Sequence, residues 1–165
     1  MKKIAVIMGS DSDLPIVKKA INVLEEFDVP YEVHIFSAHR TPDEAAEFSR
    51  NASLNGFGAI IAAAGMAAHL AGAIAANTTL PVVGIPIASG GLGGIDALLS
   101  TVQMPTGIPV ATVAVNGAAN AAFLCLQILA VSDNELAAKI VERRRKDSCA
   151  VLEKDKNVMD KLKEI

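Results

Sequence analysis

The sequence contains few cysteines and few aromatic residues for its length. Its 165 residues include no Trp, a single Tyr and two cysteines, Cys125 and Cys149. The cysteines form no CxxC pair and have no Cys and His spacing suited to zinc, so we expect two reduced thiols and no metal site built on them. Cys125 lies in the apolar run FLCLQILAV, which predicts a core position for it.

Charge is almost absent from the middle of the chain. Residues 1–50 carry 15 charged side chains and residues 133–165 carry 17, whereas residues 51–132 carry only Asp96. The 52% of apolar residues exclude a disordered chain. The net charge of −3 argues against nucleic acid as a partner, because such proteins carry a clustered basic excess. The length predicts one domain, 1–165, that is large enough to bury a core.

An uncharged stretch at 57–76 has the length of a membrane span, but it does not have the composition of one. It consists mostly of Ala and Gly, contains His69, and has neither a Trp/Tyr belt nor a basic flank. The apolar run at the N-terminus is too short for a signal peptide. We therefore expect no membrane partner and a cytoplasmic location, with the middle of the chain buried.

Short apolar segments alternate with helical segments along the chain. Strands are expected at 3–8, 31–36, 58–64, 82–87 and 110–115, and helices at 14–27, from 42, and at 67–76, 95–103 and 118–130. The inner strands are apolar throughout, as parallel strands covered on both faces are, whereas 31–36 alternates like an edge strand. This pattern predicts an α/β fold: a flavodoxin-like, doubly wound three-layer α/β/α sandwich whose five parallel strands lie in the order 2-1-3-4-5. Residues 133–165 are expected to form a charged C-terminal helical extension.

Three helix starts carry capping signals. Asp13 is expected to be the N-cap of the first helix, with Pro15 in its first turn. The segments Thr41-Pro42-Asp43-Glu44 and Ser132-Asp133-Asn134-Glu135 both read as capping boxes.

In a fold of this kind, ligands bind beyond the carboxyl ends of the strands, at the switch point between the first and third strands. The loop Gly9-Ser10-Asp11-Ser12-Asp13 follows the first strand. Its backbone N–H groups and hydroxyls suit a phosphate, and its carboxylates suit sugar hydroxyls, which together describe a phosphorylated ribose. Alternatively, Ser12 and Asp13 serve only as helix caps.

The loops after the second and third strands each contain a histidine. In Ser37-Ala38-His39-Arg40, the Arg40 guanidinium suits a phosphate, and His39 gives and takes protons near neutral pH; the alternative is a structural or solvated histidine. In the loop 65–70, small residues allow a ligand close to the backbone, and His69 either contacts that ligand or bonds to neighbouring loops. The residues alone thus predict a small phosphorylated ligand, with His39 as the acid/base candidate and no evident metal site. We assign no role to His34, and we read the basic run 143–146 as a solvated helix face.

Four segments together resemble the PurE family of purine biosynthesis over nearly the whole chain: MGSDSD (8–13), SAHRTPD (37–43), AAHLAG (67–72) and VQMPTGIPVAT (102–112). The AAHL segment is similar to the class I, or mutase, members. These move a carboxylate from the exocyclic nitrogen of 5-(carboxyamino)imidazole ribonucleotide to ring carbon C4. The resemblance implies a ribonucleotide monophosphate substrate, no metal or organic cofactor, and a homo-octamer.

The resemblance also implies roles for individual residues. His39 corresponds to the family's general acid/base. Ser10, Asp13 and Arg40 correspond to its ribose-phosphate contacts, and His69 corresponds to a second histidine that helps order the site. The implied site is completed by Ser12, Ser37, Ala38, Gly65 and Ala68.

The chain departs from the family pattern at two positions in the third loop and the helix after it. Met66 stands where many members have a second Gly, and Ala71 replaces a frequent Pro. Two other activities stay open. One is a non-catalytic nucleotide or flavin module, although a flavin site usually needs aromatic stacking, and this chain has no Trp and only one Tyr, Tyr31. The other is carboxylation of the related aminoimidazole ribonucleotide.

The helices expected at 67–76 and 118–130 have almost no polar side. A surface helix normally needs one, so we expect these two to pack against other subunits of a symmetric homo-oligomer.

Overall fold

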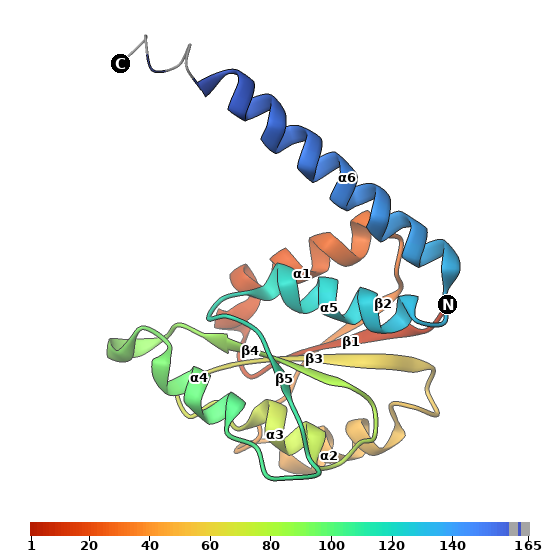
Figure 1. Cartoon of the computed structure of the whole chain (residues 1–165). Helices are drawn as coiled ribbons and strands as arrows, with labels where there is room; N and C mark the ends of the chain where they lie inside the picture. Colours follow the sequence, from red (N-terminus) through yellow and green to blue (C-terminus); the bar gives the residue numbers. More distant parts are fainter. Residues whose placement is uncertain (159–161, 163–165) are drawn as a thin grey trace.

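The structure is a computed structural model that describes residues 1–158 and 162, and it is built around one parallel sheet. The strand order is β2-β1-β3-β4-β5 (Figure 1). The strands are β1 (Lys3–Met8), β2 (Tyr31–Ile35), β3 (Phe57–Gly65), β4 (Val82–Ile87) and β5 (Ala111–Thr112). The predicted order, with the alternating strand at an edge, is confirmed.

Helices cover both faces of the sheet. On one face lie α1 (Leu14–Glu26) and α5 (Ala118–Ala130), and on the other α2 (Pro42–Asn51), α3 (Leu70–Ala75) and α4 (Ile95–Val102) (Figure 1). Successive β1 residues enter different cores: Ile4 and Val6 pack with α1 and α5, whereas Ala5 and Ile7 pack on the α3 side. Burial on both faces explains why the inner strands are apolar throughout. The three-layer α/β/α sandwich is therefore confirmed.

β5 is much shorter than the predicted strand 110–115. Its pairing with β4 reaches Gly84 and Thr112, and the Gly84 carbonyl also accepts a bond of 3.1 Å from the Val113 N–H. Two residues further along β4 stands Pro86, which has no N–H to donate to the ladder. The Pro86 carbonyl instead accepts from the N–H of Asn116, where the chain turns with φ of +58°. The proline thus ends the strand.

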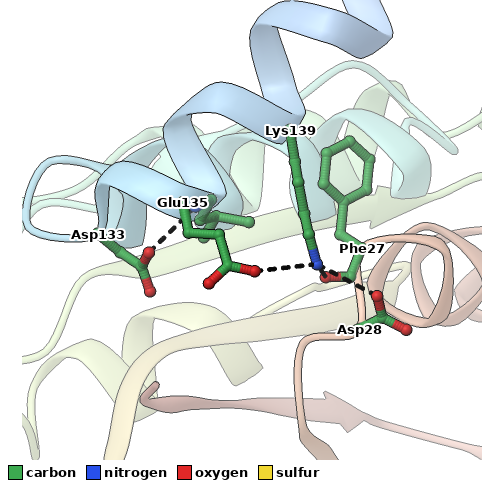
Figure 2. A network of polar contacts seen from close by, with 6 residues as sticks. Phe27, Asp28, Asp133, Glu135 and Lys139 are labelled. Carbon is green, nitrogen blue, oxygen red and sulfur yellow. Dashed lines mark hydrogen bonds and ion pairs between the residues drawn. The ribbon is translucent and has the colours of Figure 1, made fainter.

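The last described helix, α6 (Asn134–Lys156), packs against α5 and extends beyond the rest of the molecule (Figure 1). Asp133 is its N-cap, and the Asp133 side chain accepts a 3.0 Å bond from the Leu136 N–H. The predicted capping box placed the N-cap at Ser132, one residue before its position in the structure. Lys139 joins the helix to the end of α1, because its Nζ lies 3.2 Å from Asp28 Oδ2 (Figure 2). Residues 159–161 and 163–165 of the predicted extension lie outside the described residues.

The two apolar helices are buried mainly within the chain itself. In α3, Leu70 and Ile74 are buried, and in α5 Cys125 and Leu126 are buried between the sheet and the neighbouring helices. α3 also begins at Leu70, three residues later than predicted. The reason given for placing these helices against other subunits therefore does not hold. Among the described helices, none is both long and apolar enough to cross a membrane.

Edge strand β2 differs from its predicted alternation. Val33 and Ile35, the apolar members of the pattern, are exposed. His34, a polar member of the same pattern, is half-buried and stacks on Phe36 with the rings 5.3 Å apart and 6° from parallel. The ring of Phe48 on α2 lies 4.7 Å from the same histidine. An edge strand has only part of each face covered, so its sequence pattern does not decide which side chains are buried.

Candidate active site

The register of the sheet brings four loops together at its carboxyl edge. Met8 at the end of β1 pairs with Ile35 on β2 and with Ala63 on β3, and Gly65 at the end of β3 pairs with Ile87 on β4. The segments that begin at Gly9, Ser37, Met66 and Ala88 therefore start at one edge of the sheet. This is where ligands bind in doubly wound sheets, because the helix connections diverge there.

The first loop forms a compact turn around Ser10. Ser10 Oγ accepts from the Ser12 N–H at 3.3 Å, and Asp13 Oδ2 accepts from the Ser10 N–H at 3.2 Å, which is a reciprocal capping box on a single 3₁₀ turn, 11–13. Asp13 occupies the N-cap position of α1, as predicted, but its side chain makes no capping bond to that helix. Burial raises the pKa of the Asp13 carboxyl, and the N–H groups of Ser10 and Gly9 partly oppose this rise.

Ser37 and Thr41 shape the second loop. Ser37 Oγ accepts from the N–H groups of His39 and Arg40, at 3.3 and 3.2 Å. Thr41 Oγ1 accepts from the Ser37 N–H at 2.9 Å and makes no cap to α2, so the predicted capping box is absent, although the helix begins at Pro42 as expected. Both hydroxyls are thus used to hold the turn that presents His39 and Arg40, whose side chains are exposed.

The third loop approaches the fourth very closely. A β-carbon at Gly65 would lie 2.2 Å from Ser89 Oγ, so only glycine leaves room for this approach. Met66 follows in the left-handed region with φ of 55°, a conformation that costs a non-glycine residue about 1–2 kcal/mol, and its side chain is 64% exposed. Strain of this kind, held by the surrounding structure, is typical of functional loops.

The two loop histidines contact each other directly. His39 Nε2 lies 2.9 Å from His69 Nδ1, and the two rings meet edge to face, with centroids 5.1 Å apart and planes at 84°. The two histidines are thirty residues apart in the sequence. They come together because β2 and β3, which lead into their loops, both pair in parallel with β1. The arrangement leaves one nitrogen of each ring, His39 Nδ1 and His69 Nε2, without a hydrogen-bond partner among the described residues.

These loops enclose a pocket of about 510 Å³. Nine of the ten predicted site residues line it: Ser10, Ser12, Asp13, Ser37, Ala38, His39, Arg40, Gly65 and His69. Ala68 does not, because its side chain is turned into the protein and is 1% exposed. The pocket is completed by Gly9, Ala64, Met66, Ala67, Leu70 and Ser89. Gly9, Met66, Ala67 and Leu70 belong to the three loops that the sequence selects for chemistry, whereas Ala64 on β3 and Ser89 after β4 lie outside them.

The pocket has a polar half and an apolar half. The loops after β1 and β2 supply hydroxyls, the Asp13 carboxylate, the His39 ring and the Arg40 guanidinium. The end of β3 and the start of α3 supply methyl and methylene groups. In the described part of the chain the Arg40 side chain has no ion-pair partner, so its charge is available to a ligand. No group of three or more potential metal ligands occurs among the described residues.

A larger hollow, of about 910 Å³, lies at the opposite edge of the sheet. Arg50 is the only charged residue in its lining, and the guanidinium of Arg50 donates to Asn77 Oδ1 at 3.1 Å. Neither histidine nor a carboxylate lines this hollow. It therefore lacks the acid/base groups present at the carboxyl edge.

Comparison with known proteins points to one family. The sequence model described as AIR carboxylase matches residues 3–149. The chain is 54% identical to N5-carboxyaminoimidazole ribonucleotide mutase of Pyrococcus abyssi over 144 residues, which cover 87% of this chain and 83% of the relative. It is 51% identical to the Bacillus subtilis protein of the same name, over 91% of this chain and 94% of the relative.

A solved structure with the same architecture is that of Treponema denticola PurE. The two structures superpose with a TM-score of 0.85 at 26% sequence identity, over 93% of this chain and 96% of that chain. This likeness and the strand order β2-β1-β3-β4-β5 confirm the flavodoxin-like prediction. Because the family match spans most of the sequence and relatives share half of its residues, the chain belongs to the AIR carboxylase, or PurE, family.

Proposed function

We propose that this protein is an isomerase of purine biosynthesis. It moves the carboxylate of N5-carboxyaminoimidazole ribonucleotide from the exocyclic nitrogen to ring carbon C4, giving 4-carboxy-5-aminoimidazole ribonucleotide. The observation that carries the proposal is the gathering of His39, Arg40 and His69 with the first loop in one pocket, in a chain about half identical to relatives named for this activity. The proposal invokes no metal and no organic cofactor.

The polar half of the pocket is assigned to the ribose phosphate. The Arg40 guanidinium offers a planar set of donors to the phosphate oxygens. The hydroxyls of Ser10 and Ser12, whose Oγ atoms lie 2.9 Å apart, add neutral hydrogen-bonding groups. The Asp13 carboxylate accepts from sugar hydroxyls. This division lets a carboxylate and an anionic ligand share one site.

His39 is assigned to both proton transfers. The substrate is a carbamate, and a proton given by cationic His39 to its nitrogen breaks the N–C bond. The products of that step are carbon dioxide and the neutral aminoimidazole. Carbon C4 then attacks the carbon dioxide, forming the new C–C bond, and neutral His39 takes the C4 proton so that the ring regains its aromaticity. The histidine ends in the state in which it began, and a positioned group of this kind accelerates a reaction roughly 10²–10⁴-fold.

The apolar half of the pocket is assigned to the carbon dioxide. Carbon dioxide has no net charge and no hydrogen-bond donor, so a wall formed by Ala64, Met66, Ala67 and Leu70 confines it without holding it tightly. Confinement beside C4 converts a bimolecular capture into an effectively intramolecular one, which raises the rate of the recarboxylation step.

A paired assay tests the proposal. Purified protein is given either the carbamate ribonucleotide or the aminoimidazole ribonucleotide with bicarbonate, and formation of the C4 carboxylate is followed in both. We expect rapid product formation from the carbamate and little from the second mixture. The reverse result would assign the chain the carboxylase activity for which the family is described. A colourless, inactive protein that still binds the ribonucleotide would leave only a binding module.

A further inference from the structure

One hydroxyl of the pocket has no hydrogen-bond partner in the described part of the chain. Ser89 is half-buried as a residue, and its Oγ atom is fully covered and unpaired. Two other buried side-chain atoms share this condition, His34 Nε2 and Asp96 Oδ1, but neither residue lines the pocket. An unpaired buried hydroxyl is destabilising, so a native protein keeps one at a binding site only where another group can pair with it.

The other serine hydroxyls of the pocket are all engaged within their own loops. Ser12 Oγ donates to Ser10 Oγ, which also accepts from the Ser12 N–H. Ser37 Oγ accepts from two N–H groups of its turn. Ser89 stands directly before a 3₁₀ turn, 90–92, as Ser10 does before 11–13, yet the Ser89 side chain makes no bond to that turn. The local structure therefore leaves the Ser89 hydroxyl unused.

The backbone that carries Ser89 is fixed, although its hydroxyl is not. The N–H of the preceding residue, Ala88, donates to Asn116 Oδ1 at 2.9 Å. One residue earlier, Ile87 pairs with Gly65 at the end of β3. The Ser89 side chain lies against Gly65, where a β-carbon would come within 2.2 Å of Ser89 Oγ. Because no bond among the described residues holds the hydroxyl there, rotation about the Cα–Cβ bond can turn it toward a ligand.

The strand order places Ser89 at the opposite end of the pocket from Arg40. Arg40 follows β2 and Ser89 follows β4, and the two strands between them separate these loops by about 14 Å at the usual strand spacing. A ribonucleotide carries its phosphate and its base at opposite ends. A phosphate on Arg40 therefore directs the base toward the loops after β3 and β4, where Ser89 is the only hydroxyl among the residues that line the pocket.

We propose that Ser89 contacts the substrate, and that its hydroxyl donates a hydrogen bond to the migrating carboxylate. The identity of this ligand rests on the proposed function. A carboxylate only accepts hydrogen bonds, and a bond to a charged acceptor is stronger than one between neutral groups. The exocyclic nitrogen and C4 are attached to one ring at adjacent positions, so a single hydroxyl can serve the carboxylate before and after its transfer. Neutral carbon dioxide is a weaker acceptor and is free to move between them.

The binding of two ribonucleotides tests this contact. 4-Carboxy-5-aminoimidazole ribonucleotide and aminoimidazole ribonucleotide differ only in the carboxylate, so the ratio of their dissociation constants measures its recognition. Both are titrated by calorimetry into the full chain with His39→Asn as the parent, in which no turnover is expected. Adding Ser89→Ala should raise the Kd of the carboxylated ligand about 10- to 100-fold, as loss of a hydrogen bond to a charged group does, and should leave the other Kd within about threefold.

Two control variants separate the hydroxyl from its surroundings. Ser12→Ala removes a hydroxyl from the polar half of the pocket, so it should weaken both ligands by a similar factor and leave the ratio unchanged. Gly91→Ala alters the loop that contains Ser89, at a position with open space for a β-carbon and without a positive φ. It should change neither Kd. Ser89→Ala removes only an unpaired hydroxyl, so its Tm should stay close to that of the parent.

An unchanged ratio in Ser89→Ala would overturn the assignment, because a hydroxyl that pairs only with water or serves only the fold does not distinguish the two ligands. An equal change of the ratio in Gly91→Ala would overturn it too, since the effect would then belong to the loop. The titrations do not depend on turnover. A wild type without mutase activity would therefore refute the proposed function, while a changed ratio would still support the Ser89 contact. A parent that binds neither ribonucleotide would refute both.

Discussion

One added methyl group at Gly65 gives a sharply defined perturbation of this site. Gly65 ends β3, and its φ is not positive, so the position requires space and not backbone freedom. A β-carbon there would lie 2.2 Å from Ser89 Oγ, 3.1 Å from Ser89 Cβ and 3.3 Å from the Ile87 carbonyl oxygen. Rotation of the Ser89 side chain relieves the first contact but not the other two.

We therefore expect Gly65→Ala to destabilise the protein by about 1–3 kcal/mol, as overpacking does. For a chain of this size each kcal/mol corresponds to about 2–4 °C in Tm. Among the described residues Ser89 Oγ is buried without a hydrogen-bond partner, so Ser89→Ala should change Tm little. In the double variant the 2.2 Å contact is absent. The coupling between the two changes should then be about 0.5–2 kcal/mol in the direction of rescue.

The assay is thermal unfolding of the wild type, both single variants and the double variant at one protein concentration, with mutase turnover measured beside it. Turnover should fall in Gly65→Ala because Met66 and His69 follow on the displaced loop, and it should recover in part in the double variant. Strictly additive Tm changes, or a Gly65→Ala variant as stable as the wild type, would refute the steric explanation of this glycine.

Four further outcomes are expected. His39→Asn should abolish isomerisation but leave ribonucleotide affinity, measured by calorimetry, within about tenfold of the wild type; near-normal turnover would remove His39 from the mechanism. Arg40→Ala should weaken ribonucleotide binding by about 1.5–3 kcal/mol, and Arg144→Ala on α6 is the control that should not. Burial raises the pKa of Cys125 to about 12, so at pH 8 a thiol reagent should modify exposed Cys149 and reach Cys125 only after denaturation. Light scattering should give the mass of a homo-octamer, and the mass of a single chain would contradict the assembly prediction.

The sequence predicted the sheet well because burial on both faces leaves a simple signal. The segments at 3–8, 58–64 and 82–87 are apolar throughout, and each forms an inner strand within a residue or two of its predicted bounds. The strand at 110–115 could not be bounded in the same way. This strand ends where it does because Pro86, on the neighbouring strand β4, has no N–H to donate. The apolar pattern of 110–115 alone carries no information about its partner strand.

The candidate site was predictable at the level of loops but not of contacts. The switch-point rule selects the loops that contain His39 and His69, because strand ends in a parallel sheet share one edge. It does not indicate that the two rings meet at 2.9 Å, or that Ala68 turns inward between exposed neighbours. The Thr41 hydroxyl matched a capping pattern, but it holds the Ser37 turn instead. Short polar side chains have several backbone partners within reach, and tertiary structure selects among them.

The uncharged middle of the chain now divides into two parts with different consequences. Its inner strands β3 and β4, α3 and most of α5 are covered within the chain, so they do not require a partner. Apart from Leu54, Met66 and Val131, the large apolar side chains that this region exposes lie on and just before α4: Leu92, Ile95, Leu99 and Val102. We therefore expect a homo-octamer to cover α4, in place of the α3 and α5 faces that their composition suggested. The segment that leads into α4 begins at Ser89, which lines the pocket, so subunit contacts on α4 would also hold the fourth wall of the site.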